Sequence, residues 1–337
     1  MKRSIHFKLL QQISVLLISL LAFAVSAQEK IDKLVIAGPF AAVSDPLIHM
    51  ANTNALSDVA KEVEFVTWTN PDQLRAMAIG NQAHFIAMPS NVAANMFNRG
   101  VKLKLLNISV WGVLWMVSRE NDLKTLADFK GKEVAMPFRG DMPDIVFSLL
   151  AEAQGIDPKT DFYLRYVANP LDAMQLLIMR RVDHALLAEP AISMALRKTR
   201  SFPVSVIAPD LFRSVDLQKE WGRLFKHDSR IPQAGMVALE ATLDNPRLIA
   251  RFNEEYAKSL QWCLDNPEEA GKMVAERIDM LTPEAVADSI GVSQFKFISA
   301  TDARPELEFF FQKLMDKTPA LVGEKLPDPS FYYTPAP

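Results

Sequence analysis

Two runs of alternating strand-like and helix-like segments most strongly constrain how this chain can fold. Buried-strand segments at 34–40, 62–68 and 83–88 are each followed by a polar helix start, at Ser44, Asn70 and Ser90 respectively. Strands that alternate with helices predict parallel sheets covered on both faces. The sequence therefore predicts an α/β fold.

The second run repeats this order further along the chain. A short helix, a Gly131 turn and a strand occupy 124–138, and further strands are predicted at 162–168 and 182–188. Helices follow at Asp141, Asn169-Pro170 and Glu189-Pro190. Two extended segments separate the runs, so we predict two mostly parallel sheets, each with its own core.

The remaining segments are less regular. We predict a strand at 204–208, an extended segment at 233–243, mostly helix from Pro246 to about Leu314, and an irregular tail from Thr318.

The N-terminus has the three parts of a secretory signal. Lys2, Arg3 and Lys8 precede an apolar stretch at 13–25, and small residues follow at 25–27. We predict that residues 1–27 are cleaved and that the mature chain is a soluble periplasmic protein. An uncleaved membrane anchor is the alternative, but the stretch is short for a membrane span.

Several function classes lack their sequence signals. The formal net charge of −3 argues against a protein that binds nucleic acid by phosphate neutralisation. The single cysteine, Cys263, excludes an internal disulfide and a cysteine-based metal site. The glycine-rich nucleotide motifs, the hydrolase elbow and metal-ligand histidine spacings are absent from the sequence. We therefore predict no catalytic residue, metal or cofactor.

Polar and aromatic residues follow the predicted strands, where open α/β sheets bind their ligands. Helix N-termini there present unpaired N–H groups. Two such sheets facing each other would form a cleft. The candidate ligand-binding residues are Phe40, Ser44, Trp68, Ser90, Asn91, Arg139, Asp141, Asn169, Glu189, Gln233 and Gly235.

Most of these residues also have a purely structural interpretation. Arg139 could pair with an anion or lie on the surface, and Asp141 could cap a helix rather than meet ligand. Ser90 is expected to cap its helix whether or not it also contacts ligand. Glu189 could accept an amine or ring N–H, or could stabilise the first turn of its helix.

The aromatic candidates Trp68, Trp111 and Trp115 leave the ligand class open. Trp111 and Trp115 are four residues apart in an extended segment, so we expect them to share one face, with core packing as the alternative role. Trp68, at a strand end, is the best stacking candidate. A site led by rings favours a heterocycle, whereas a site led by Arg139 favours an anion.

Three segments resemble one protein family. They are AHFIAMPSNVAANMFNRG at 83–100, DLKTLADFKGKEVAMPFRGDMPDIVFSLLAEAQGIDP at 122–158 and DAMQLLIMRRVDHALLAEPA at 172–191. Together they resemble the solute-binding proteins of ABC importers, in the NMT1/THI5-like branch for nitrate, sulfonate, taurine and thiamine-pyrimidine precursors. Phe138-Arg139-Gly140-Asp141 departs from that branch, which often has a Gly-Ser/Thr pair there.

The resemblance implies a two-lobed periplasmic binding fold of type II. Lobe 1 would hold residues 28–117 and 225–337, and lobe 2 would hold 118–224. A ligand would lie between the lobes, hinge closure would enclose it, and the closed form would dock on a membrane permease. We expect a monomer that transports without catalysis.

Two alternatives share the fold that the resemblance implies. One is a periplasmic ligand sensor, and the other is a pyrimidine-precursor synthase that uses pyridoxal phosphate and histidine.

Overall fold

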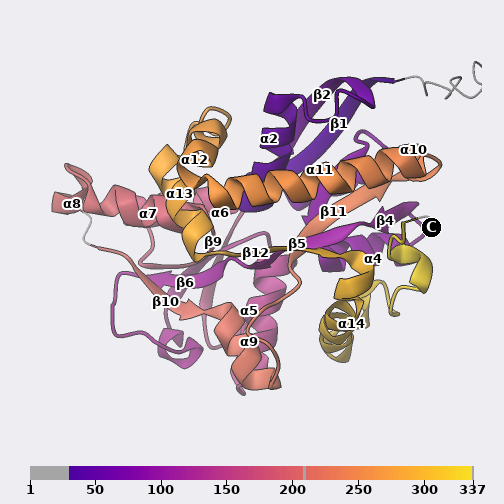
Figure 1. Cartoon of the computed structure of the whole chain (residues 1–337). Helices are drawn as coiled ribbons and strands as arrows, with labels where there is room; N and C mark the ends of the chain where they lie inside the picture. Colours follow the sequence, from indigo (N-terminus) through magenta and orange to yellow (C-terminus); the bar gives the residue numbers. More distant parts are fainter. Residues whose placement is uncertain (1–29, 208–209, 336–337) are drawn as a thin grey trace, which may run out of the picture.

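The structure, a computed structural model, describes residues 30–207 and 210–335 and contains two β-sheets, one of seven strands and one of five. Helices flank both sheets (Figure 1). The predicted α/β fold with two helix-flanked sheets is therefore confirmed. The predicted signal segment, residues 1–27, lies outside the described residues.

The first sheet contains the strands of the first run. Its parallel strands are β1 (Ile31–Pro39), β2 (Ala60–Trp68) and β3 (Phe85–Pro89), with β1 in the middle. Its antiparallel strands are β4 (Leu103–Leu105), β5 (Asn107–Gly112), β11 (Ala234–Leu239) and β12 (Gln294–Ser299). The helices of this run are the 3-10 turn η1 (Ala42–Ser44), α2 (Asp45–Thr53), α3 (Pro71–Ile79) and α4 (Ser90–Asn98).

The second sheet contains the second run. Its strand order is β10-β6-β9-β7-β8, in which β8, β7 and β9 are parallel and β6 and β10 are antiparallel. The strands are β6 (Leu114–Ser118), β7 (Glu133–Pro137), β8 (Tyr163–Val167), β9 (His184–Ala188) and β10 (Phe212–Asp216). The helices are η2 (Leu126–Phe129), α5 (Met142–Glu152), α6 (Pro170–Ile178), α7 (Ala191–Arg200), α8 (Val204–Ile207) and α9 (Leu217–Phe225).

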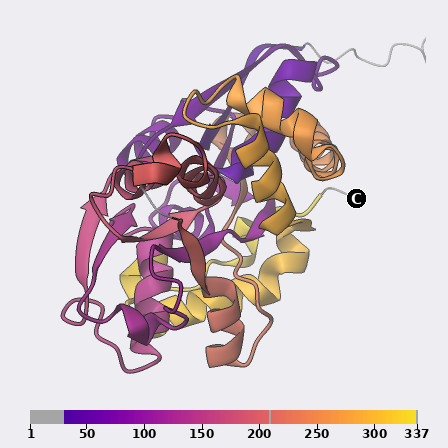
Figure 2. The same cartoon turned by 90° about the vertical axis from the view of Figure 1, so that its left-hand side faces the viewer.

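The C-terminal part of the chain is mostly helical. Its elements are α10 (Glu240–Leu243), α11 (Pro246–Asp265), α12 (Pro267–Ala275), α13 (Pro283–Val292), α14 (Ala300–Lys317), η3 (Pro319–Val322) and η4 (Pro329–Phe331). The long α11 packs on α2, whereas α13 packs on α7 of the second sheet (Figure 1). In Figure 2, which turns the left-hand side of Figure 1 toward the viewer, α7 and α8 lie in front. The C-terminal helices therefore contact elements of both sheets.

Helices begin where we predicted them at the two asparagines that precede a proline, Asn70 and Asn169. The Asn70 side chain accepts a hydrogen bond from Gln73 N at 2.9 Å, and Asn169 accepts one from Asp172 N at 3.0 Å. Each satisfies one of the free N–H groups of its first helical turn. These caps fix where the helices begin relative to the strands before them.

One predicted strand is wrong, and two strands were not predicted. Residues 204–207 form the short helix α8 rather than a strand, and Val206 is 74% exposed. The strand beside β6 is instead β10, which the sequence analysis did not identify. Residues 294–299, within the region predicted as mostly helical, form β12, in which the half-buried Phe295 and Phe297 alternate with the exposed Gln294 and Lys296.

The sheets are more mixed than we predicted. In each sheet only the strands of the βαβ units pair parallel, and β4, β5, β11 and β12 of the first sheet and β6 and β10 of the second pair antiparallel. The chain crosses at Val113, between β5 and β6, so Trp111 and Trp115 lie in different sheets rather than on one shared face.

Two clusters of buried apolar side chains stabilise the fold. The larger spans the first sheet and reaches α5, α9 and α14, and the smaller joins α6, α7 and β9 to α12 and α13. Within residues 30–207 and 210–335, no helix is both long and apolar enough to cross a membrane.

We expect the free energy of unfolding to fall as the pH drops through about 6.5, partly because of His184. Burial lowers the pKa of this histidine, which bonds Ser118 Oγ at 3.0 Å and meets the Phe129 ring edge-on. Between the lowered folded pKa and the unfolded value of about 6.5, the unfolded chain binds more protons, so stability rises with pH. Urea unfolding between pH 5 and 8 should show this slope, and His184→Gln should make it shallower. An unchanged slope would contradict the prediction.

Candidate functional site

A small cavity of about 90 Å³ lies where the carboxyl ends of the parallel strands of both sheets meet. From the first sheet it is lined by Pro39, Ala41, Ala42, Val43, Trp68, Met88, Pro89, Val110, Val113, Gln233 and Ala234. From the second sheet it is lined by Leu114, Phe138, Met142, Pro143, Pro170, Ala188 and Glu189. The cavity is therefore built by both halves of the molecule.

Two aromatic rings in the cavity wall, one from each sheet, contact each other. The centroids of Trp68, at the end of β2, and Phe138, after β7, are 6.2 Å apart and their planes are tilted by 47°. Trp68 Nε1 donates to Ala87 O at 3.0 Å, which fixes the indole and satisfies its donor. A flat ligand ring in this cavity would therefore have aromatic surface from both sheets.

Phe138 is held in an unusual backbone conformation. Its φ of 55° is in the left-handed region, which is costly for a residue with a bulky side chain. Its N–H donates to Val167 O at 3.2 Å, and its carbonyl accepts from Asp141 N at 2.9 Å. These bonds keep Phe138 in a conformation that places it on the cavity wall.

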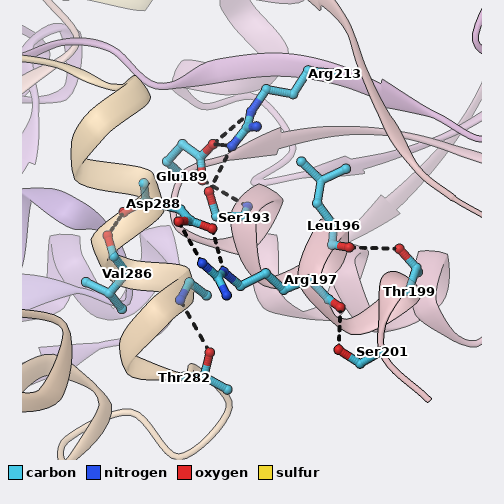
Figure 3. A network of polar contacts seen from close by, with 12 residues as sticks. Glu189, Ser193, Leu196, Arg197, Thr199, Ser201, Arg213, Thr282, Val286 and Asp288 are labelled. Carbon is cyan, nitrogen blue, oxygen red and sulfur yellow. Dashed lines mark hydrogen bonds and ion pairs between the residues drawn. The ribbon is translucent and has the colours of Figure 1, made fainter. Parts of the chain in front are cut away.

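Glu189 is the one ionisable group that lines the cavity among the described residues, and it is 1% exposed. Its Oε1 accepts from Arg213 Nε at 3.1 Å and Nη2 at 2.5 Å, and its Oε2 accepts from Ser193 N at 3.0 Å. Figure 3 shows the Arg213 guanidinium and Ser193 converging on this carboxylate. The position and charge of this buried carboxylate are therefore fixed by Arg213 and Ser193.

The network around Glu189 extends toward α13. Arg197, on α7, donates to both oxygens of Asp288 at 2.5 and 2.8 Å (Figure 3). The hydrogen bond from Arg197 lowers the pKa of Asp288, and the charge of Arg213 lowers it further. Arg213 therefore acts on a carboxylate at the cavity and on one at the helix interface.

The helix starts that face the cavity from the second sheet already hold carboxylates. Asp141 caps α5 by accepting from Met142 N at 2.9 Å, and Asp144 Oδ2 accepts from Gly140 N at 2.8 Å. Glu189 accepts from Ser193 N in the first turn of α7. The positive ends of these helices are therefore neutralised by the protein's own side chains.

Asp141 also joins the two halves of the molecule. Its Oδ2 lies 3.1 Å from Arg75 Nη2, on α3 of the first sheet. Burial raises the pKa of Asp141, and the charge of Arg75 opposes that rise. This ion pair and the pair of Trp68 and Phe138 are both contacts between the halves.

Gln233 and Asn91 each bring an unsatisfied buried acceptor to this region. Both are 97% or more buried, and neither Gln233 Oε1 nor Asn91 Oδ1 has a hydrogen-bond partner. Gln233 lines the cavity directly, whereas Asn91 lies behind Pro89 in the first turn of α4. A buried acceptor without a partner is costly, so Gln233 Oε1 is suited to a ligand donor.

Of the eleven candidate residues, the structure places Trp68, Glu189 and Gln233 on the cavity wall. Phe40 is half-buried and packs on the smaller apolar cluster. Ser44 is fully buried and donates to Pro39 O at 2.7 Å. This contact needs glycine at position 38, where a Cβ would be 2.3 Å from Ser44 Oγ.

The predicted helix cap at Ser90 is wrong. Ser90 is the first residue of α4, and its hydroxyl donates to Pro232 O at 2.5 Å instead of accepting from the helix. Gly235 lies where two strands approach closely, since a Cβ there would be 1.8 Å from Asn107 O. Ser90 thus ties α4 to the segment before β11, and Gly235 allows β11 to approach β5.

Arg139 and Asn169 lie away from the cavity wall. Arg139 is exposed, and its guanidinium carbon is 4.9 Å from the centre of the Tyr166 ring. Asn169 is the cap of α6, and the next residue, Pro170, lines the cavity. Neither side chain brings a positive charge or an amide to the cavity wall.

Sequence reasoning missed Phe138, Arg213 and Gln218. Phe138 carried one usable signal, because it ends a predicted strand two residues before a glycine. Arg213 and Gln218 carried none, since β10 and the start of α9 were not identified as elements.

The described residues offer no obvious metal or histidine chemistry. Within 30–207 and 210–335 there is no group of three histidine, cysteine, aspartate or glutamate side chains that could hold a metal ion. None of the four histidines in this part of the chain lines the cavity.

Comparison with known proteins gives a family and a set of similar structures. The model of the NMT1/THI5-like family matches residues 62–270. An ABC transporter structure from Parabacteroides distasonis has 22% identity and a TM-score of 0.69, covering 91% of this chain and 99% of its own. No curated protein gave a significant match.

Two further structures carry ligand names. The periplasmic aliphatic sulphonate binding protein SsuA from Escherichia coli has 15% identity and a TM-score of 0.66, covering 90% of this chain and 93% of its own. The periplasmic nitrate-binding protein NrtA from Synechocystis PCC 6803 has 13% identity and a TM-score of 0.66, covering 86% of this chain and 82% of its own. At these identities the similarity establishes the fold that the three proteins share with this chain.

Proposed function

Because this chain belongs to the NMT1/THI5-like family, we propose that it is an extracytoplasmic solute-binding protein that delivers a small molecule to an ABC import permease. The cavity between the two sheets is the ligand site. The fold that the chain shares with SsuA and NrtA supports this proposal. We place the mature protein in the periplasm as a monomer, after cleavage of residues 1–27.

The ligand we propose is a flat, nitrogen-containing ring that donates hydrogen bonds and carries no negative charge. The observation that carries this proposal is the cavity lining, in which every residue but two, Glu189 and Gln233, is apolar or aromatic. An anion would meet Glu189 and helix starts already occupied by Asp141 and Asp144. Of the two ligand classes that the sequence left open, we therefore favour the heterocycle.

We further propose that the protein closes over this ligand by a hinge between lobe 1, residues 28–117 and 225–337, and lobe 2, residues 118–224. Because β5 and β6 pair in different sheets, we place the first hinge at Val113. The Arg75–Asp141 ion pair and the Trp68–Phe138 ring pair support a closed form that the protein itself stabilises.

A thermal unfolding series tests the ligand class. Residues 28–337 would be heated with 4-aminopyrimidine, with an alkanesulfonate and with nitrate, each over a range of concentrations. Ligand at 100 times its Kd adds about 2.7 kcal/mol to stability, so 4-aminopyrimidine should raise the Tm by several degrees. Stabilisation by the sulfonate or nitrate alone would overturn the proposal, and chemical conversion of the ring compound would show an enzyme instead.

A further inference from the structure

Gln233 is a cavity-lining residue with a rigid backbone. It immediately precedes β11, its N–H donates to Val110 O at 3.0 Å, and its carbonyl accepts from Ser90 N at 2.9 Å. The residue is 2% exposed. Which end of its amide faces the ligand therefore decides whether the wall offers a donor or an acceptor.

A second amide, Gln218 on α9, sets that orientation. Gln233 Nε2 donates to Gln218 Oε1 at 3.0 Å. Because the amide nitrogen of Gln233 is engaged by Gln218, its oxygen is the end left without a partner.

Gln218 is in turn fixed by main-chain groups at the crossing between the sheets. Its Oε1 accepts from Leu114 N at 3.1 Å, and its Nε2 donates to Leu114 O at 3.0 Å and to Asp216 Oδ1 at 2.9 Å. A rotation of this amide by 180° would put N–H against N–H and oxygen against oxygen. Gly112 leaves room for the Gln218 side chain, since a Cβ at position 112 would be 2.9 Å from Gln218 Cγ.

We propose that Gln218 is a positioning residue that makes Gln233 an obligate hydrogen-bond acceptor for the ligand, and so selects ligands with an N–H group. This inference rests on the proposed function. It adds to that function a residue outside the cavity wall that sets ligand specificity. A site built to accept a hydrogen bond discriminates strongly against an analogue that lacks the donor, because its buried oxygen is then left unpaired.

The test is a ratio of affinities for two matched probes, 4-aminopyrimidine and pyrimidine, measured by calorimetry. The wild-type protein should prefer 4-aminopyrimidine by at least tenfold. Gln218→Met, which keeps the length of the side chain but not the amide, should reduce this preference at least threefold, while the Glu189 carboxylate still accepts from the ligand. Gln233→Met should do the same by removing the acceptor itself.

Gln218→Glu is the matched control. Its carboxylate still accepts from Gln233 Nε2, so the preference should stay near the wild-type value even though Leu114 O and Asp216 Oδ1 lose their donor and the Tm falls. A residue with a merely structural role would lower the Tm without changing the ratio of affinities.

The outcomes separate the two proposals. Binding of neither probe by the wild-type protein would overturn the ring-ligand proposal and this inference with it. A wild-type preference that persists in Gln218→Met, or that is lost equally in Gln218→Glu, would overturn the inference alone. If Gln218→Met does not fold, the comparison of Gln218→Glu with Gln233→Met decides, because only Gln233→Met should lower the preference.

Discussion

Replacing Glu189 with glutamine is expected to weaken the binding of 4-aminopyrimidine by about a hundredfold and to lower the free energy of unfolding by roughly 2–4 kcal/mol. The carboxylate is almost fully buried, and both of its oxygens are engaged. A glutamine has one acceptor oxygen, so it cannot serve Arg213, Ser193 N and a ligand N–H together. The loss of stability arises mainly because Arg213 keeps its charge without a counter-ion.

Two further variants separate the effects on binding and stability. Glu189→Gln with Arg213→Gln removes both charges, so it should recover much of the stability but not the affinity. Glu254→Gln is the matched surface control: Glu254 pairs with Lys258 on exposed α11 surface, and its loss should leave the free energy of unfolding nearly unchanged. Urea unfolding and calorimetry measure both quantities. Wild-type affinity in Glu189→Gln would remove the carboxylate from ligand recognition.

The sequence predicted those parts of the fold that depend on contacts between residues close together in the chain or on the order of the elements. The Asn70 and Asn169 caps depend on contacts three residues away, and the parallel strands follow from the order of elements. β12 and β10 depend on partners far along the chain, at β5 and β6, so their short patterns did not distinguish them from helix or loop. The antiparallel pairs in both sheets were not predicted for the same reason, because their partners are also far apart in sequence.

The candidate site was predicted as a region but only partly as residues. Strand ends converge on the cavity because parallel strands end at one edge, which placed Trp68, Glu189 and Gln233 correctly near it. Their roles as ligand contacts stay predictions. At the end of β7 the left-handed backbone of Phe138 puts that residue on the wall, whereas Arg139 lies exposed over Tyr166. A positive φ at a phenylalanine has no reliable sequence signal.

Gln218 could not have been found from sequence because its role depends on tertiary structure. It lies 104 residues from Leu114 and 15 from Gln233, and these partners meet only when both sheets have formed. Buried amides that orient one another are therefore visible only in the folded chain.

Replacing Arg75 with alanine is expected to speed release of a bound ring compound by about tenfold. Arg75 and Asp141 lie on opposite halves of the molecule, and the Asp141 side chain is 4% exposed. Closure therefore buries a carboxylate whose pKa burial already raises and whose charge Arg75 compensates. Without Arg75, closure leaves Asp141 unpaired, so the closed form becomes less stable relative to the open one. Stopped-flow displacement of bound 4-aminopyrimidine measures the release rate.

The same measurement on three further variants assigns the effect to the ion pair. Asp141→Asn keeps an oxygen to cap α5 but needs no counter-ion, so Arg75→Ala should have little effect in that background. Lys61→Ala, which breaks an exposed pair with Asp32 within the first sheet, should leave release unchanged. If Arg75→Ala speeds release equally with aspartate or asparagine at position 141, the arginine acts through packing alone. The closed form would then owe its stability to the rings of Trp68 and Phe138, and Phe138→Ala should speed release more than Arg75→Ala does.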